Sequence, residues 1–191
     1  MGRVSVKSSR RTLFRKVPDE WHEEVEVVVV GSGFAGLAAA AEAAGLGARV
    51  VILEKMRRYG GNSLISGGGY ASWDSKLHLR QELDLGEDSQ EQHREDTLVG
   101  GDRYNIPALV EIMTRGAPEG LGWLIDTGVQ FARTLPRLGG HSAHRSHHAM
   151  KYGRGITEPL KKLAINRGAE LRTNMTVTAI LRKDEDSPVL G

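Results

Sequence analysis

Two short apolar segments flank an alanine-rich stretch near the start of the chain. The first, Val25–Val30, barely alternates between apolar and polar residues, which predicts a strand buried on both faces, as in a parallel sheet. The stretch that starts near Phe34 predicts a helix that ends at Gly45 or Gly47. The second apolar segment, Val50–Leu53, predicts the neighbouring parallel strand of a strand–helix–strand unit.

The turn between the first strand and the helix has the spacing Gly-x-Gly-x-x-Gly. Gly31 permits a tight turn, Gly33 lets the backbone approach a pyrophosphate, and Gly36 lets the helix pack close to the strand. The first N–H groups of the helix point toward the same place and attract phosphate. Glu54 ends the second strand, where a carboxylate can accept ribose hydroxyls. The context of the motif therefore predicts a dinucleotide site.

The middle of the chain predicts helices rather than strands. Ser89 is expected to cap a helix that runs through Leu98 and ends at Gly100–Gly101. A second helix is expected after Asn105, with Pro107 near its start. Four of its residues are expected to face inward: Leu109, Val110, Ile112 and Met113.

Pro118 predicts the start of a third helix, which Gly128 ends. Its inward residues are expected to be Leu121, Leu124 and Ile125, and Trp123 is interpreted as a core residue. A last helix is expected from Ile156 or Thr157 to Gly168. A strand pair, Glu170–Arg172 and Met175–Leu181, is expected to close the chain.

Composition and charge limit the classes of protein. The chain has 191 residues, the size of one domain or of part of a larger one. It has no cysteine, which excludes disulfides, cysteine-ligated zinc, iron–sulfur clusters and c-type haem attachment from this chain. A net charge of +2 gives no indication of nucleic-acid binding, and no apolar run approaches the ~20 residues that span a bilayer.

Residues 1–22 are interpreted as a basic N-terminal arm, and residues 23–191 as the N-terminal part of a nucleotide-binding domain. Ser9–Phe14 resembles the start of a twin-arginine export signal. Such a signal needs an apolar segment next, whereas Arg15–Glu20 is mostly charged. The expected location is therefore cytoplasmic.

A second glycine-rich segment follows the strand–helix–strand unit. Gly60–Tyr70 contains five glycines and three small polar residues, which predicts a loop whose backbone N–H groups line a ligand. In a plain NAD dehydrogenase, the segment after the second strand usually leads into another helix, with no such loop. The segment therefore indicates a ligand with a large ring system, and a flavin is the interpretation that fits.

Four sequence segments together resemble the flavoprotein subunits of the fumarate reductase/succinate dehydrogenase superfamily, above all its soluble fumarate reductases and flavocytochrome-c-type members. These are GSGFAG (Gly31–Gly36), ILEK (Ile52–Lys55), GGNS (Gly60–Ser63) and SGGGYASW (Ser66–Trp73). The resemblance continues through to about residue 182. It implies an α/β, Rossmann-like FAD-binding fold of the glutathione-reductase type. It also implies an FAD-dependent oxidoreductase that transfers hydride between the flavin and a carbon–carbon bond next to a carboxylate or carbonyl.

The resemblance implies which residues hold FAD. Together with the glycine motif they are Gly31, Gly33, Phe34, Ala35, Gly36, Glu54, Lys55, Gly61, Asn62, Ser63, Ser66, Gly67, Gly68 and Val177. Asn62 stands where membrane-bound members carry the histidine that binds FAD covalently, so we expect a non-covalent FAD. Neither a metal site nor a catalytic residue is carried over, since the family's substrate-binding and proton-donating residues lie in segments downstream of Gly191.

The resemblance also implies that residues 23–191 are the N-terminal part of an FAD-binding domain, whose fold is incomplete on its C-terminal side. The expected partners are a small unsaturated acid or enone, the missing C-terminal half or a complementary subunit, and an electron-transfer protein. Two alternatives remain open. The chain could be a non-catalytic nucleotide- or FAD-binding fragment or subunit. It could instead be an NAD(P)-dependent reductase in which Arg57 and Arg58 hold a 2′-phosphate, although Glu54 would repel one.

Four histidines lie within eight residues, from His141 to His148. Flanking glycines indicate a loop, and no helical frame presents the histidines in pairs. Three interpretations remain: a loop near the flavin, a solvated surface, or a metal site. In the first, Arg145 or His147 would offset negative charge on a reduced flavin.

Overall fold

The computed structural model describes residues 18–182 and 187–191. It divides into two compact units. The larger, residues 25–176, holds every helix and strand of the described residues. The other contains residues 18–24, 177–182 and 187–191, where the backbone N–H of Leu190 donates to the carbonyl of Leu181 at 2.7 Å.

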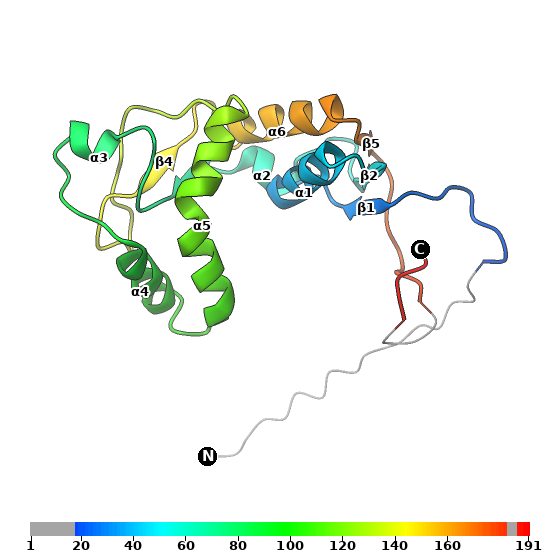
Figure 1. Cartoon of the computed structure of the whole chain (residues 1–191), viewed down its shortest axis with the longest axis horizontal. Coiled ribbons are helices and arrows are strands. Elements are labelled where there is room, and N and C mark those ends of the chain that lie inside the picture. The colour runs from blue at the N-terminus through cyan, green and yellow to red at the C-terminus, as the bar shows by residue number, and fades with distance from the viewer. Residues whose placement is uncertain (1–17, 183–186) are drawn as a thin grey trace, which may run out of the picture. The chain divides into compact units, whose positions relative to one another are not determined.

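A three-stranded parallel sheet lies at one end of the larger unit (Figure 1). Its strands are β1 (Val27–Val30), β2 (Val50–Leu53) and β5 (Glu170–Arg172), in the order β1-β2-β5. Between β1 and β2 lies α1 (Phe34–Gly45), as the sequence predicts. The α/β fold class is confirmed.

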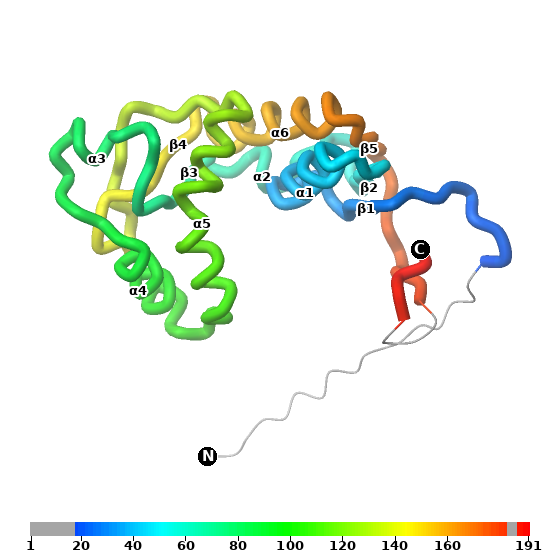
Figure 2. The backbone as a smooth tube through the Cα atoms, in the orientation of Figure 1, coloured from blue at the N-terminus to red at the C-terminus, as the bar shows by residue number. Residues whose placement is uncertain are grey.

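Helix α6 (Arg154–Asn166) precedes β5 and packs against α1, as the tube in Figure 2 shows. Their contact is built largely from alanines and leucines, because small side chains allow two helices to approach closely. Its fully buried members are Leu37, Ala40, Ala41, Leu160 and Ala164. Together with Val50 and Ile52 of β2 they form part of the hydrophobic core. The core therefore lies between the α1–α6 pair and the sheet, and it supports the two elements that flank the glycine turn.

The expectation that the first strand is buried on both faces is wrong. Val28 and Val30 are 53% and 61% exposed, and they alternate with the half-buried Val27 and Val29. Strand β1 is the edge of the sheet, and α1 and α6 pack against one of its faces. An unbroken valine run hides this alternation, because hydropathy alone cannot separate the two faces.

The glycine-rich segment and the histidine segment meet in a small antiparallel sheet. Strand β3 (Gly69–Ala71) pairs with β4 (Ser146–His148). Before β3, residues Gly61–Ile65 form the short helix α2, so this segment is not the continuous loop that its glycines predict. The histidine segment is likewise not a plain loop, because its last residues form β4.

Three further helices complete the larger unit (Figure 1). They are α3 (Leu79–Glu82), α4 (Gln90–Gly100) and α5 (Pro107–Asp126). As predicted, Ser89 caps α4: its Oγ accepts the N–H of Gln92 at 3.1 Å. Within the described residues, no helix is both long enough and apolar enough to cross a bilayer.

The prediction that Pro118 opens a new helix is wrong, since α5 continues through it. Proline has no N–H, so the carbonyl of Thr114, four residues earlier, loses its helical partner. In this structure the indole N–H of Trp73 donates to that carbonyl at 2.8 Å. A residue 41 positions away in sequence therefore satisfies the carbonyl that the proline leaves without a helical partner.

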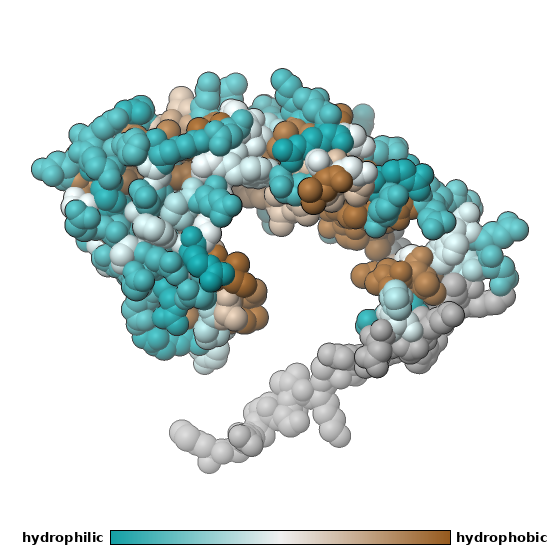
Figure 3. Space-filling model, viewed as in Figure 1, coloured by the Kyte–Doolittle hydropathy of each residue, from teal (hydrophilic) through white to brown (hydrophobic). Residues whose placement is uncertain are grey.

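The prediction of which residues face inward is also wrong for the first half of α5. Of the four residues expected there only Val110 is buried, whereas Leu109, Ile112 and Met113 are 58%, 57% and 48% exposed. The buried face consists of Val110, Thr114, Ala117, Leu121 and Leu124, a regular helical spacing. Figure 3 shows the hydrophobic surface near the start of α5 that results.

The expected strand Met175–Leu181 does not form. After β5, Asn174 adopts the left-handed conformation with φ 58°. The N–H groups of Asn174 and Met175 then donate to the carbonyls of Met56 and Glu54, at 3.1 and 2.9 Å. The chain therefore turns across the end of β2 rather than extending the sheet.

Candidate functional site

The turn after β1 has the geometry that its glycines predict. Gly31 has φ 92°, which favours glycine, and its N–H donates to the carbonyl of Leu53 at 2.9 Å. A Cβ on Gly36 would overlap the carbonyl of Gly31. Any side chain at Gly36 would therefore push α1 away from the turn.

The N-terminus of α1 faces the second glycine-rich segment. Gly33 is the N-cap, and the first bond within the helix runs from the N–H of Leu37 to the carbonyl of Gly33, at 2.9 Å. The N–H groups before Leu37 have no acceptor within the helix. Ser63 of α2 supplies one, since its Oγ accepts the N–H of Phe34 at 3.1 Å. The remaining N–H groups at this end are available to an anion.

Glu54 is buried at the end of β2, with 5% of its surface exposed. Its Oε2 accepts the N–H and the hydroxyl of Ser32, at 3.0 and 2.6 Å. Its Oε1 accepts the N–H of Met56 at 2.9 Å. Burial disfavours the charged carboxylate, but these hydrogen bonds outweigh it, so the pKa of Glu54 lies below its usual value.

The second glycine-rich segment is held against α6. Ser66 donates its hydroxyl to the carbonyl of Ser63 at 2.9 Å, and its own carbonyl accepts the N–H of Gly153 at 2.9 Å. A Cβ on Gly68 would overlap the backbone of Tyr152. These contacts bring the start of α6 against residues 63–68, so the shape of this segment depends on a part of the chain far away in sequence.

A cavity of about 300 Å³ opens beside the N-terminus of α1. It is lined mainly by apolar groups, among them Phe34 and Ala35 of α1, Gly69 and Tyr70 of β3, and Trp123 of α5. Trp123 packs against the hydrophobic core, as predicted, and also lines this cavity. Burial raises the pKa of the Tyr70 hydroxyl, which therefore stays protonated at neutral pH.

Arg145 is a structural residue, contrary to the interpretation that it faces a flavin. Its side chain is fully buried. It binds both carboxylate oxygens of Asp88, at 2.9 and 2.7 Å, and one oxygen of Asp96, at 2.6 Å. Arg80 also contacts Asp88, at 3.2 Å. This buried charge cluster joins α3, α4 and the start of β4.

Three histidines near this cluster have lowered pKa values. Burial and the charge of Arg145 lower the pKa of His93 to about 4 and lower the pKa of His141 as well. His147 is buried, which lowers its pKa, and its ring packs edge-on against Phe131. Among the residues that the structure describes, no group of three histidine or carboxylate side chains is placed to hold a metal ion.

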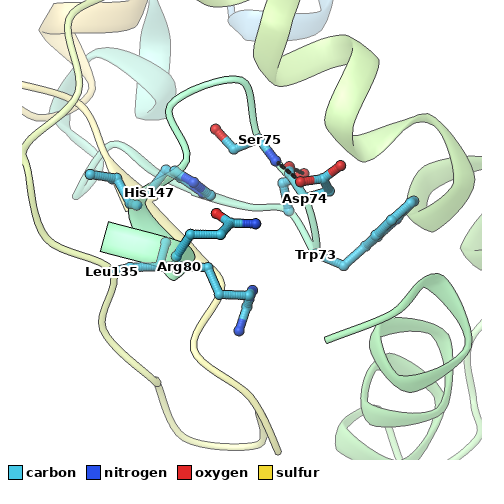
Figure 4. Close-up of a pocket in the computed structure, with 9 residues that line it drawn as sticks. Trp73, Asp74, Ser75, Arg80, Leu135 and His147 are labelled. Carbon is cyan, nitrogen blue, oxygen red and sulfur yellow. Dashed lines mark hydrogen bonds between the residues drawn. The ribbon is translucent and has the colours of Figure 1, made fainter. Parts of the chain in front are cut away.

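Figure 4 shows a second, much smaller pocket, of about 10 Å³, beside β4. His147, Arg80 and Leu135 line it, and Asp74 accepts the N–H of Ser75 at 2.7 Å. It is too small for more than one water molecule. Of these two pockets, the apolar cavity beside α1 is therefore the better candidate for a ligand.

The structure brings most of the predicted cofactor-binding residues together at the carboxyl ends of β1 and β2: residues 31–36, Glu54, and residues 61–68. Lys55 and Asn62 lie there too and are exposed. Val177 belongs to the other unit, so its role stays a prediction. Sequence reasoning missed Ser32, which occupies a variable position of the motif and is fully buried.

The arrangement fits a dinucleotide. A helix N-terminus with free N–H groups suits a pyrophosphate, and a buried carboxylate 22 residues beyond Ser32 suits a ribose. At Gly33 the space is limited as well, since a Cβ there would lie 3.1 Å from Ser63 Oγ.

Comparison with known proteins identifies the relatives of this chain. It is 41% identical to the acrylate reductase flavoprotein subunit of Shewanella woodyi over 74% of the chain. It is 33% identical to a fumarate reductase (cytochrome) of Shewanella frigidimarina over 94% of the chain, and 41% identical to the urocanate reductase of Eggerthella lenta over 72%. It spans only 28%, 31% and 22% of these relatives.

The fold is similar to that of solved flavoproteins. The open conformation of a flavocytochrome c3 fumarate reductase superposes with a TM-score of 0.75 at 32% identity, covering 84% of this chain and 28% of that one. Residues 26–191 match the sequence profile of the family described as FAD binding domain. With the glycine turn, the helix N-terminus and Glu54 in place, the chain belongs to this FAD binding domain family.

Proposed function

We propose that this chain is the FAD-binding N-terminal part of an oxidoreductase that reduces or forms a carbon–carbon double bond next to a carboxylate or carbonyl. The observation that carries the proposal is the meeting of three nucleotide-binding features at one edge of the sheet: the glycine turn, the N-terminus of α1 and Glu54. The relatives named above reduce acrylate, fumarate or urocanate by their names, which supports this reaction class.

The residues have separate roles in binding. The free N–H groups at the start of α1 would bind the pyrophosphate, and Glu54 would accept from the ribose of the adenosine. Backbone groups of Gly61–Gly68 would lie along the ring system. Bound FAD would supply the two-electron redox chemistry, which the amino acids themselves lack.

We further propose that FAD is bound without a covalent link. Asn62 is an amide, which cannot form the bond that a histidine makes at this place, and the chain has no cysteine to replace it. The proposed partners are a small unsaturated acid or enone, the polypeptide that completes the fold, and an electron donor.

The test is to purify the chain, add FAD and measure flavin absorbance, then assay fumarate, acrylate and urocanate with a reduced dye. We expect FAD to bind weakly to this chain alone, and turnover to require a chain that includes the downstream segments. A colourless protein that still binds a partner subunit would favour a non-catalytic role. Tight NADPH binding without flavin would favour a nicotinamide-dependent reductase.

A further inference from the structure

One buried serine connects the two ends of the proposed cofactor site. Ser32 is fully buried, between two glycines of the turn after β1. Its hydroxyl donates to Oε2 of Glu54 at 2.6 Å and accepts the N–H of Gly60 at 2.9 Å. Its own N–H donates to the same Oε2 at 3.0 Å. Ser32 is therefore bound to the ribose-binding end and to the start of the glycine-rich segment at once.

The hydrogen bonds on Glu54 determine which oxygen can serve a ligand. A carboxylate has about four lone-pair positions, two on each oxygen. Ser32 occupies both positions on Oε2, and Met56 occupies one on Oε1. The position left for a ribose hydroxyl therefore lies on Oε1. Without the Ser32 hydroxyl, the carboxylate would lose its strongest constraint and could rotate.

The other bond of Ser32 fixes the turn that leads into α2. Gly60 is left-handed, with φ 95°, and a Cβ on it would lie 2.8 Å from Cβ of Leu64. The carbonyl of Gly60 accepts the N–H of Leu64 at 3.1 Å, which starts α2. Ser63, which binds the N-terminus of α1, lies on this helix. The position of α2 thus depends on the Ser32–Gly60 bond.

We propose that Ser32 is a positioning residue that presents Oε1 of Glu54 to the adenosine ribose and fixes the glycine-rich segment for the flavin ring. The ligand in this inference comes from the proposed FAD site, whereas the hydrogen bonds of Ser32 are observed in the structure. Ser32 acts before any ligand binds, since its three hydrogen bonds are within the protein.

A first experiment needs no ligand. The carboxyl pKa of Glu54 and the exchange protection of the Gly60 amide are measured by NMR in the natural chain and in Ser32→Ala. The natural chain should show a depressed Glu54 pKa and a protected Gly60 amide, and Ser32→Ala should raise that pKa and remove the protection. The matched control is Ser72→Ala, a buried serine whose hydroxyl donates to the carbonyl of Asp74 at 2.6 Å. An unprotected Gly60 amide in the natural chain would overturn the proposal even if Ser32→Ala does not fold.

A second experiment measures the two ends of the proposed cofactor site separately. ADP is the probe for the ribose-binding end, and FMN is the probe for the flavin end. Ser32→Ala should weaken ADP binding at least about tenfold, the lower end of the loss for one hydrogen bond to a charged group, and should weaken FMN binding as well. Glu54→Ala should weaken ADP binding alone. In the double variant the loss for ADP should be smaller than the sum of the two single losses, because Ser32 acts on the ribose through Glu54.

The outcomes distinguish this inference from the proposed function. Additive losses in the double variant, or FMN binding that is unchanged by Ser32→Ala, would overturn the positioning role. If the natural chain binds neither ADP nor FMN nor FAD, the proposed function fails. The role of Ser32 is then decided by the ligand-free measurements alone.

Discussion

Ser63 Oγ accepts a hydrogen bond from the backbone N–H of Phe34 at 3.1 Å, across 29 residues of sequence. The bond joins the helix after the first glycine motif to the short helix in the second glycine-rich segment. It satisfies one N–H at the start of α1 and leaves its neighbours free. Two segments that sequence analysis treats as separate motifs therefore form one wall of the site.

Replacing Gly33 with valine should abolish flavin binding. A Cβ at this position would lie 3.1 Å from Ser63 Oγ, and the added methyl groups would occupy the approach to the free N–H groups. Gly116→Val is the matched control, because a Cβ at Gly116 in α5 would meet no atom within 4 Å apart from its own stretch of helix. Absorbance of the purified variants after addition of FAD checks the prediction. A full flavin spectrum in Gly33→Val would show that the phosphate site lies elsewhere.

Removing the carboxylate of Glu54 should weaken FAD binding by a few kcal/mol at most. A hydrogen bond to a charged group contributes about 1.5–3 kcal/mol, and the structure leaves few acceptor positions on this side chain. Titration of FAD into Glu54→Ala measures the loss, with the exposed Glu42→Ala as control. Unchanged affinity would place the ribose elsewhere, and a gain in NADPH binding would support the nicotinamide-dependent alternative.

Acid precipitation should release all the flavin. The residue at the expected attachment position is Asn62, and the chain has no cysteine. After trichloroacetic acid treatment of FAD-loaded protein, the yellow colour should be in the supernatant. A yellow pellet, with a flavin peptide in its tryptic digest, would contradict the prediction.

Stability should fall as the pH falls from about 6.5 to about 4, because of His93. The folded protein holds the pKa of His93 at about 4, compared with 6.5 for an ordinary histidine, so in this range only the unfolded chain binds the proton. The loss should amount to about 3 kcal/mol. The free energy of unfolding, measured by urea titration at several pH values in this range, checks the prediction. His93→Gln should flatten the dependence, and the same change at the exposed His22 should not.

Replacing Arg145 with methionine should cost about 3–5 kcal/mol of folding free energy, since it leaves buried carboxylates without their main partner. The side chain of Asp88 is fully buried and that of Asp96 is 15% exposed. Arg133→Met is the control, because Arg133 pairs with Glu82 at the surface and such pairs contribute at most about 1 kcal/mol. Equal urea midpoints for the two variants would contradict the structural role of Arg145.

The sequence predicts the strand–helix–strand unit well because each of its parts has a local cause. Gly31 needs a positive φ, Gly36 needs a close approach, and the alanines of α1 favour a thin helix. The start of α1 at Phe34 and the bounds of β2 at Val50–Leu53 are confirmed.

The errors arise where distant contacts decide the structure. The sequence predicts a helix start at Pro118, but the helix continues, and the indole of Trp73 binds the carbonyl that the proline leaves without a partner. The sequence suggests Arg145 as a cation beside a reduced flavin, but in the structure its buried side chain binds Asp88 and Asp96. No local sequence pattern could show the two carboxylates that bind Arg145, since they lie 49 and 57 residues away from it.

The valines of β1 have a practical consequence for anyone who produces this chain. Val28 and Val30 present branched hydrocarbon to water on an edge strand, which is a common cause of aggregation during expression. Threonine has nearly the same shape as valine and is also favoured in strands, but carries a hydroxyl. A double Val28→Thr, Val30→Thr variant would therefore be a more tractable protein for spectroscopy, with the cofactor-binding turn left unaltered.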